Sequence, residues 1–527
     1  MMKSFYRQEI IVAAALVFCS ISRGDPDYMG QAAIRAISTL DGSGVRLAQP
    51  EASDNFTNTI SWEVNPAIVG QPATKFTYTS SSGTATTFPN SVGGESGHAE
   101  YTVGAVIYGY PNGLATNLSN IDGYEANYFI NNIVGAAVPI AAPLVNQSFA
   151  DNDTNNETAY DTIYDNYAAQ YRTLFITGAG NGPSPGVIVP VEPPSTCYNG
   201  ISAGAYQNFT NQAAAGPTPV GGRCKPDITV ISSYTSSSAA VVSGAAALLM
   251  QAALRGDGGD TNAAFDLRTI KALLLNGAVK PASWTNSPAT PLDFRYGAGV
   301  VNILDSYEQL AGGKSAISVS NTVSLNGVHP PVGGAVTVGS LSGWNLATNT
   351  SSTANDSIHH YYFNVSNTVP VKFTATATLV WMKHYNKSAI NNLDLFLYDC
   401  ANSNLVASST SRVDNVEHIW KTGLAPGRYD LQVWKAGGST VTTNEIYALA
   451  FEFMPAPAVA ITGGPNPQLT WPLYPADYLV EGTTNLLSGA WSANGLPAIP
   501  VITNGLNSIQ LSTTNAAQFF RLRRPNL

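Results

Sequence analysis

Residues 234–251 read YTSSSAAVVSGAAALLMQ and place a row of hydroxyl groups directly before a long apolar run. The apolar run predicts a buried helix over residues 236–254. Serine and threonine at such a position are ordinary N-caps, because their side chains bond the free backbone N–H groups of the first turn. A serine nucleophile would also need a base, a group that orients the base, and donors for an oxyanion elsewhere in the chain.

Before residue 315, apolar runs alternate between strand and helix patterns. Apolar strands separated by helices are typical of a mostly parallel sheet with helices on both faces. The sequence therefore predicts an α/β fold for this part of the chain. The expected strands are Val45–Gln49, Thr173–Thr177 and Ile228–Ile231, and the expected helices are Gln31–Leu40, one that ends near Arg172, and Phe265–Gly277.

The chain changes character near residue 315. Helical periodicity disappears, and short alternating runs follow, such as KFTATATLVWM (372–382) and LDLFLYD (393–399), with Asn, Ser and Gly turns between them. This pattern is typical of a β-sandwich. A linker rich in Pro and Gly begins at Pro455 and precedes a last short β segment. We predict a signal peptide at 1–24, an α/β domain at 25–315, a β-sandwich at 316–454 and a small β module at 455–527.

The N-terminus has the layout of a secretory signal peptide. Lys3 and Arg7 precede the apolar run Ile10–Ile21, which is too short to span a bilayer and is followed by small and polar residues. We expect removal near Gly24; a buried N-terminal helix is the alternative. No later segment has the length and apolarity of a membrane anchor, so we expect a secreted, cell-surface or periplasmic protein without a membrane span.

Composition argues against a nucleic-acid partner. Charged residues make up 11% of the 527 residues, the net charge is -9, and no basic block is present that could neutralise a phosphate backbone. Of the four cysteines, Cys197, Cys224 and Cys400 remain after signal removal. A disulfide between Cys197 and Cys224 fits an oxidising compartment, but sequence does not supply its geometry, so their pairing stays open.

The stretch that opens with Tyr234 resembles the serine segment of the subtilisin-like serine proteases, the subtilase family. The family pattern is G-T-S-M-A-T-P-H-V-A-G-A-A-A-L-L, and an alignment without gaps over the apolar run matches its Thr-Ser to residues 235–236. The resemblance therefore singles out Ser236, rather than Ser237 or Ser238, as the nucleophile. The segment KPDI at 225–228 repeats the family's K-P-D-I a short distance upstream.

Further segments follow in the order of the family. GHAEYTVG (97–104) resembles G-H-G-T-H-V-A-G, which implies that His98 is the general base. FITGAGN (175–181) resembles the strand that ends in A-A-G-N, which implies that Asn181 donates to the oxyanion. GVRLAQPE (44–51) resembles G-V-x-V-A-V-I-D, with Glu51 in the place of the acid. With YGAGVVN (296–302) as the closing G-x-G-x-V-N, the resemblance covers roughly residues 40–315.

The resemblance implies a subtilisin-like fold and a secreted serine endopeptidase. Glu51, His98 and Ser236 would form a Ser-His-Glu triad that hydrolyses peptide bonds through an acyl-enzyme, with Asn181 as oxyanion donor. Glu51 is one methylene longer than the family's Asp, and Asp54 is a competing acid. No cofactor is expected.

The chain also departs from the family pattern, and this keeps another function open. Tyr234 replaces the Gly before Thr-Ser, and Ala240 replaces a Pro. The alternative is a subtilase-fold protein that no longer cleaves and serves as a binding or surface-attachment scaffold. Sedolisin chemistry, with Glu as base, is disfavoured because His98 fits the histidine segment.

The stretch LVNQSF (144–149) resembles the family segment that pairs with substrate. It implies that substrate is bound by Leu144, Val145, Asn146, Gln147 and Ser148; an ordinary buried strand is the alternative. We predict no metal ligands and leave calcium open, because the spacing of the next four aspartates matches no calcium loop. We expect a solvated surface at these four positions, Asp151, Asp153, Asp161 and Asp165.

The C-terminal segments resemble modules that are appended to secreted proteases. NNLDLFLYD (391–399) and LAPGRYDLQVW (424–434) resemble pre-peptidase C-terminal and proprotein-convertase-like β-sandwiches. Residues 469–492 resemble a short C-terminal β module, with Tyr478, Val480 and Trp491 as its expected core. The resemblance implies protein or peptide substrates for the α/β domain and a surface or polymer as partner of the β domains, with a plain structural role as the alternative.

Overall fold

The structure is a computed structural model. It describes residues 29–31, 34–35, 39–53, 60–182, 187–206, 214–327, 329–366, 372–438, 440–456, 459–462, 467–472, 479–486, 490–492, 501–503, 506–511 and 518–523. The predicted signal peptide, Asp54, Tyr478 and part of the predicted helix Gln31–Leu40 lie outside the described residues.

The chain forms two compact units. The first comprises Asp41–Gln251 together with the short segment Lys383–Asn386, and the second comprises Pro26–Leu40, Ala252–Met382 and Lys387–Leu527, apart from the residues that the structure does not describe. Contacts define these units, and the domain boundaries predicted from the sequence stay predictions.

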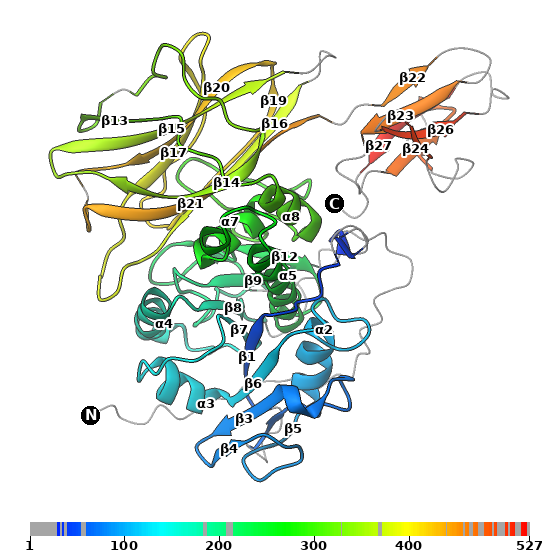
Figure 1. Ribbon diagram of the computed structural model, residues 1–527, viewed down its shortest axis with the longest axis vertical. Helices are drawn as coiled ribbons and strands as arrows, with labels where there is room; N and C mark the ends of the chain where they lie inside the picture. The colour runs from blue at the N-terminus through cyan, green and yellow to red at the C-terminus, as the bar shows by residue number, and fades with distance from the viewer. Residues whose placement is uncertain are drawn as a thin grey trace. The chain divides into compact units, whose positions relative to one another are not determined.

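An eight-stranded sheet forms the centre of the first unit (Figure 1), with the strand order β12-β9-β8-β7-β1-β6-β3-β4. All pairs in it are parallel except β3 with β4. This confirms the predicted mostly parallel sheet. The strands are β1 (Arg46–Glu51), β3 (Phe76–Ser80), β4 (Gly83–Ala85), β6 (Asn120–Glu125), β7 (Leu144–Gln147), β8 (Leu174–Gly178), β9 (Ile201–Tyr206) and β12 (Ile228–Ile231).

The remaining elements of this unit are helices and short strand pairs. The helices are the π-helical segments His98–Gly104 and Phe129–Val134, the 3-10 turns Ala73–Lys75 and Thr154–Asn156, and α2 (Ala105–Ile107), α3 (Ala126–Tyr128), α4 (Glu157–Tyr171) and α5 (Thr235–Arg255). The strand pairs are β2 (Ser61–Glu63) with β5 (Gly94–Glu95), and β10 (Gly216–Pro217) with β11 (Cys224–Lys225).

Helix α4 packs on the sheet through its aromatic face. The rings of Tyr164 and Tyr167 lie edge-on to Phe175 of β8, with ring centroids 4.9 Å and 5.7 Å apart. The three rings are fully buried. Edge-to-face pairs of this kind stabilise a core beyond the area that they bury. The helix ends near Arg172, as the sequence predicts, and Arg172 itself has a left-handed backbone (φ 56°).

Helix α5 begins at the carboxyl end of β8. A β-carbon placed on Gly178, the last residue of β8, would lie 3.0 Å from the carbonyl oxygen of Thr235, so a larger residue would require the two segments to move apart by a few tenths of an ångström. Among the described helices, α5 has the length and apolarity of a membrane span, but 78% of its most apolar window is buried inside the protein. That burial is what we expect of a core helix.

The second unit contains a β-sandwich, as predicted (Figure 1). Its two antiparallel sheets have the orders β13-β15-β20-β17-β18 and β14-β21-β16-β19. The strands are β13 (Val319–Ser324), β14 (Ser342–Thr350), β15 (Asn355–Val365), β16 (Phe373–Trp381), β17 (Leu393–Asp399), β18 (Asn404–Ser409), β19 (Val416–Leu424), β20 (Gly427–Lys435) and β21 (Asn444–Pro455).

Alternation of side chains fills the sandwich core. On β20, Tyr429, Leu431 and Val433 point inward and join a buried cluster with Leu395 of β17 and Phe451 of β21. Side chains on a strand alternate between its two faces, which is why the sequence pattern identified these strands. The described part of this unit also contains the helices α6 (Thr261–Ala264), α7 (Leu267–Asn276) and α8 (Ile303–Ala311).

Two small antiparallel sheets follow the sandwich. They consist of β22 (Ala460–Thr462), β23 (Gln468–Pro472), β26 (Leu506–Gln510) and β25 (Val501–Thr503), and of β24 (Leu479–Thr483) with β27 (Phe519–Arg523). Val480 belongs to their buried cluster, as predicted, together with Leu469, Trp471 and Ile509. Trp491 is not part of this cluster; the guanidinium of Arg521 lies 4.6 Å from its ring centroid.

Candidate active site

Glu51 and His98 meet at the end of β1. Oε2 of Glu51 lies 3.0 Å from Nδ1 of His98, although the two residues are 47 positions apart. The Glu51 side chain is buried (1% exposed), and that of His98 is 21% exposed. A carboxylate that accepts from Nδ1–H keeps Nε2 of the imidazole available as a proton acceptor, which is the tautomer that a general base needs.

Gln49, on the same strand, holds the Glu51 carboxyl in place. Its Nε2 donates to Oε1 of Glu51 at 3.0 Å and to the carbonyl of Ala99 at 3.1 Å. The hydroxyl of Tyr108 donates to Oε1 of Gln49. Gln49 and Tyr108 are both buried, so their polar atoms are satisfied by one another rather than by water. The sequence analysis did not single out this pair; position 49 lies two residues before the acid and therefore on the same face of β1.

Ser236 lies in the first turn of α5, next to Ser148. Its Oγ donates to the carbonyl of Ser148 at 3.2 Å, and Oγ of Ser148 donates to the carbonyl of Ser236 at 2.9 Å. Asn146 continues this chain, since its Nδ2 donates to Oγ of Ser148 at 3.0 Å. Ser236 is partly exposed, whereas Ser148 is buried. The structure therefore brings Ser236 to the end of β7, where its hydroxyl hydrogen bond goes to Ser148 rather than to His98.

Asn181 lies just beyond the end of β8 and faces the start of α5. Its Oδ1 accepts from the backbone N–H of Thr235 at 3.1 Å and from Oγ1 of Thr235 at 3.2 Å. Because both bonds engage the amide oxygen, the NH₂ group of this exposed side chain is turned away from Thr235. The carboxamide and the first turn of α5 thus present N–H donors at one end of the sheet.

The stretch predicted to bind substrate is mostly interior. Leu144, Val145, Asn146 and Gln147 form β7, which pairs with β1 on one side and β8 on the other, and all four are fully buried. Ser148, which follows the strand, forms hydrogen bonds with Ser236. Substrate contact through this stretch stays a prediction, and within it Ser148 is the residue beside the candidate nucleophile.

Residues 78–299 match the model of the subtilase family, Peptidase_S8. These residues form a subtilase domain. The match includes His98, Asn181 and Ser236, and it identifies a family of serine peptidases whose substrates are proteins or peptides. It begins at Tyr78, so Glu51 lies outside it, and the assignment of the acid depends on the geometry around His98.

Among solved structures, tripeptidyl peptidase 2 (TPP II) matches at 11% identity with a TM-score of 0.33; the match covers 78% of this chain and 45% of that chain. A protein described as S41 psychrophilic protease matches at 16% identity with a TM-score of 0.33, over 52% of this chain and 97% of that chain. No curated protein matches the chain.

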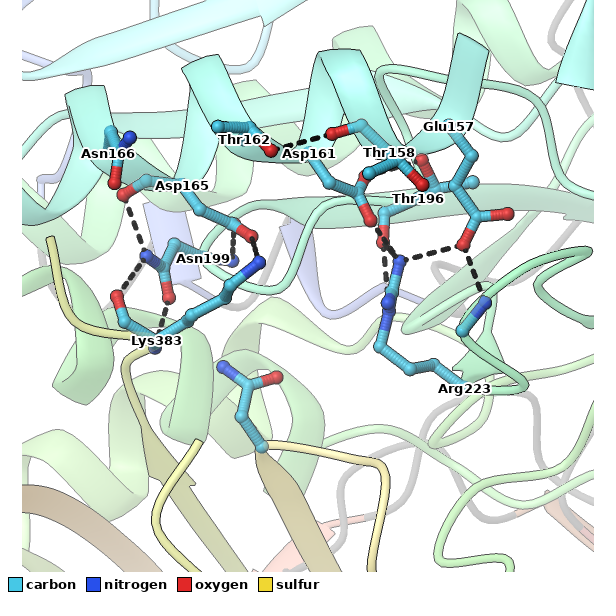
Figure 2. Close-up of polar contacts among 12 residues, drawn as sticks. Glu157, Thr158, Asp161, Thr162, Asp165, Asn166, Thr196, Asn199, Arg223 and Lys383 are labelled. Carbon is cyan, nitrogen blue, oxygen red and sulfur yellow. Dashed lines mark hydrogen bonds and ion pairs between the residues drawn. The ribbon is translucent and has the colours of Figure 1, made fainter. Parts of the chain in front are cut away.

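A buried ionic cluster joins α4 to Arg223 within the subtilase domain (Figure 2). Helix α4 turns Glu157 and Asp161 toward Arg223, whose Nη2 contacts both carboxylates and the carbonyl of Thr196. All of these charged side chains are at most 6% exposed. The guanidinium also lies 4.1 Å from the ring centroid of Tyr198. Paired charges with further hydrogen bonds are the form in which ionised groups are tolerated in a core.

Asp165 extends the same face of α4 toward Lys383 (Figure 2). Oδ2 of Asp165 lies 3.4 Å from Nζ of Lys383, and its Oδ1 accepts from the backbone N–H of Asn199 at 2.9 Å. Burial, together with the neighbouring Asp161, raises the pKa of Asp165 to about 6. The predicted solvated surface is therefore wrong for Asp161 and Asp165: both are buried, because Arg223 and Lys383 supply the compensating charge.

Cys197 and Cys224 are buried thiols and are not joined by a disulfide, so the pairing left open by the sequence is not formed. Within the described ranges, no group of three or more His, Cys, Asp or Glu side chains is arranged to hold a metal ion.

Proposed function

We propose that this protein is a secreted serine endopeptidase in which Ser236 is the nucleophile, His98 the general base and Glu51 the acid that orients the base. The observation that carries the proposal is the buried contact between Glu51 and Nδ1 of His98. A surface histidine would not need a buried carboxylate behind it, and a buried carboxylate is stable only when its oxygens are bonded, as here by Gln49 and His98.

In the first half-reaction, Oγ of Ser236 bonds to the carbonyl carbon of the substrate while Nε2 of His98 takes the hydroxyl proton. The C–N bond then breaks as His98 returns that proton to the leaving amine, which leaves an ester on Ser236. In the second half-reaction, water attacks the ester while His98 takes a proton from it. His98 then gives this proton to Oγ of Ser236, the acid product leaves, and the free Ser236 hydroxyl is restored. Glu51 stabilises the imidazolium that forms in both halves.

The oxyanion of each tetrahedral intermediate would be bound by the NH₂ group of Asn181 and the backbone N–H of Ser236. The bonds between Oδ1 of Asn181 and Thr235 support this role, since they orient the amide with its donors away from Thr235. The backbone N–H of Ser236 lies in the first turn of α5, where the helix dipole favours negative charge, and Asn181 faces that turn from the end of β8.

Reaction requires the hydroxyl of Ser236 to leave the Ser148 carbonyl and turn to His98. The Ser236–Ser148 bond is 3.2 Å long, which is at the weak end for a hydroxyl donor. A rotation about one side-chain torsion breaks it, and hydrogen bonds between catalytic groups often tighten only when substrate is bound.

Export is part of this proposal and is inferred from residues 1–24, which lie outside the described residues. The charged start and the short apolar run support a cleaved signal peptide. N-terminal sequencing of the protein recovered from the medium or periplasm of an expressing bacterium tests this: we expect a start near Asp25, and a cell-associated chain that retains Met1 would contradict it.

A fluorophosphonate probe tests the nucleophile, because it bonds only to an activated serine. We expect labelling of the wild type and none of Ser236→Ala or His98→Ala. Ser237→Ala is the matched control, since it removes a hydroxyl from the next position of the same helix turn, and it should label like the wild type. Absence of labelling in the folded wild type, or equal labelling of Ser236→Ala, would leave the non-cleaving scaffold as the function.

A further inference from the structure

The carboxyl group of Glu192 lies against Gly180, the residue before Asn181. A β-carbon placed on Gly180 would overlap Oε2 of Glu192 and lie 2.6 Å from its Cδ. Gly180 has a left-handed backbone (φ +106°), and the backbone N–H of Glu192 donates to the carbonyl of Ala179 at 2.9 Å. The left-handed backbone favours glycine at position 180, and because glycine has no side chain, the carboxyl group approaches the backbone beside the candidate oxyanion amide.

The surroundings of this carboxyl group are apolar and acidic. Ala179, Val191 and Ala214 form a buried cluster next to Gly180, and the backbone N–H of Ala214 donates to the Gly180 carbonyl at 2.9 Å. A second carboxylate, that of Asp151, is near enough to affect Glu192, and burial together with Asp151 raises the pKa of Glu192 to about 7. Among the described residues, no side chain donates to or forms an ion pair with the Glu192 carboxyl group.

The segment that carries Glu192 is fixed to the rest of the unit. The backbone N–H of Ser195 donates to the Glu192 carbonyl at 3.0 Å, and Oγ1 of Thr196 donates to Oδ1 of Asp161 at 2.7 Å. Arg223 holds the Thr196 carbonyl at 2.7 Å. The ionic cluster of Figure 2 therefore anchors the residues just after Glu192. A half-buried acid on an anchored segment can select a charge, because its backbone is held at a fixed place beside Gly180.

We infer that Glu192 makes this protease select lysine or arginine as the acyl-side residue, the substrate residue whose carbonyl carbon Ser236 attacks. The inference rests on the proposed function, which places that carbonyl oxygen at Asn181. The side chain of the acyl-side residue branches one bond from the carbonyl carbon and therefore falls near Gly180. There its cation would reach the carboxyl group of Glu192, with Asp151 adding attraction.

An ion pair between Glu192 and the substrate cation would also remove an unfavourable free energy in the enzyme without substrate, where none of the described residues supplies the half-buried acid with a counter-ion. An acid that burial and a neighbouring carboxylate keep partly protonated gains a counter-ion only when a basic substrate arrives. A neutral or acidic side chain would leave it unpaired. Discrimination then arises from rejection as well as attraction.

Matched peptides that differ only in the acyl-side residue test the inference with purified wild type, Glu192→Gln and Glu192→Lys. Wild type should cleave after Lys and Arg with a kcat/KM at least roughly tenfold above that after Met, since even a partly exposed ion pair with a hydrogen bond is worth about that factor. Glu192→Gln should lose this ratio but keep cleavage after Met, and Glu192→Lys should favour Glu over Lys.

Glu95→Gln, which removes an exposed carboxylate of β5, is the matched control and should keep the wild-type ratio. Fluorophosphonate labelling of each variant at the wild-type rate shows that the fold and the nucleophile are intact. Wild type that cleaves after Met as well as after Lys, or an unchanged ratio in Glu192→Gln, would overturn the inference and leave the proposed function standing. No cleavage of any peptide together with no labelling would overturn both.

Discussion

Oε2 of Glu51 lies 3.0 Å from Nδ1 of His98, on residues that β1 and the π-helical segment His98–Gly104 bring together across 47 positions of the chain. The longer acid is accommodated because Gln49 bonds its other oxygen, Oε1. The carboxyl group is thereby held at both oxygens, and His98 is held in one tautomer.

Glu51→Gln should lower kcat by about 10³- to 10⁴-fold with little change in KM, because an amide in this place stabilises the wrong imidazole tautomer and no imidazolium. Peptide cleavage kinetics measure it. Glu51→Asp keeps the charge but shortens the side chain, so its kcat should lie between that of the wild type and that of Glu51→Gln. A loss below tenfold in Glu51→Gln would indicate that another acid, such as Asp54, orients His98.

Asn181→Ala should lower kcat by about 10²- to 10³-fold, since it removes one oxyanion donor, and should leave KM nearly unchanged because the donor acts in the transition state. It also removes the acceptor for the Thr235 N–H, so thermal unfolding must be measured beside the kinetics. A variant that is as stable and as active as the wild type would contradict the assigned role.

The preference for basic over neutral acyl-side residues should rise as pH increases through about 7, the pKa to which burial and Asp151 raise Glu192. Above that pH the carboxyl group of the free enzyme is ionised and attracts the cation without first losing a proton. The ratio of kcat/KM for Lys and Met peptides measures this, since any effect of pH that acts on both substrates alike cancels. The ratio should be independent of pH in Glu192→Gln; the same pH dependence there would assign the effect to another group.

Arg223→Ala should destabilise the subtilase domain by about 3–5 kcal/mol, because it leaves Glu157 and Asp161 as buried carboxylates without their cation. Denaturant unfolding measures the change. Arg223→Lys should restore only part of it, since one ammonium cannot reproduce the forked contacts of a guanidinium. Near wild-type stability in Arg223→Ala would mean that water reaches these carboxylates.

Asp394→Asn should stabilise the sandwich unit at pH 8 relative to the wild type, by roughly 2–4 kcal/mol. Burial raises the pKa of Asp394 to about 7, and its Oδ1 has no hydrogen-bond partner among the described residues. The pKa of Asp394 is higher in the folded state than in the unfolded state. The protonated acid therefore stabilises the folded state fully below about pH 4, and this stability is lost as pH rises through about 7. Unfolding curves at pH 4 and pH 8 should differ less in Asp394→Asn than in the wild type.

The sequence alone determined the elements and the order of the reactive groups. Apolar runs and a helix-start serine predicted β8, β12 and α5 to within a residue or so, since strand and helix periodicity are local properties. The segments around His98, Asn181 and Ser236 were found differently, from their resemblance to motifs of the subtilase family that occur in the same order.

Only the tertiary structure decided which side chains meet. The sequence predicted that Asp161 and Asp165 lie at the surface, because nothing near them in the chain supplies a cation. In the structure their cations, Arg223 and Lys383, come from distant segments. Glu192 is twelve positions from Gly180, and its contact depends on how the anchored segment returns to the end of β8. Burial, ion pairing and the pKa shifts that follow are set by long-range packing of strands and helices, which no local pattern encodes.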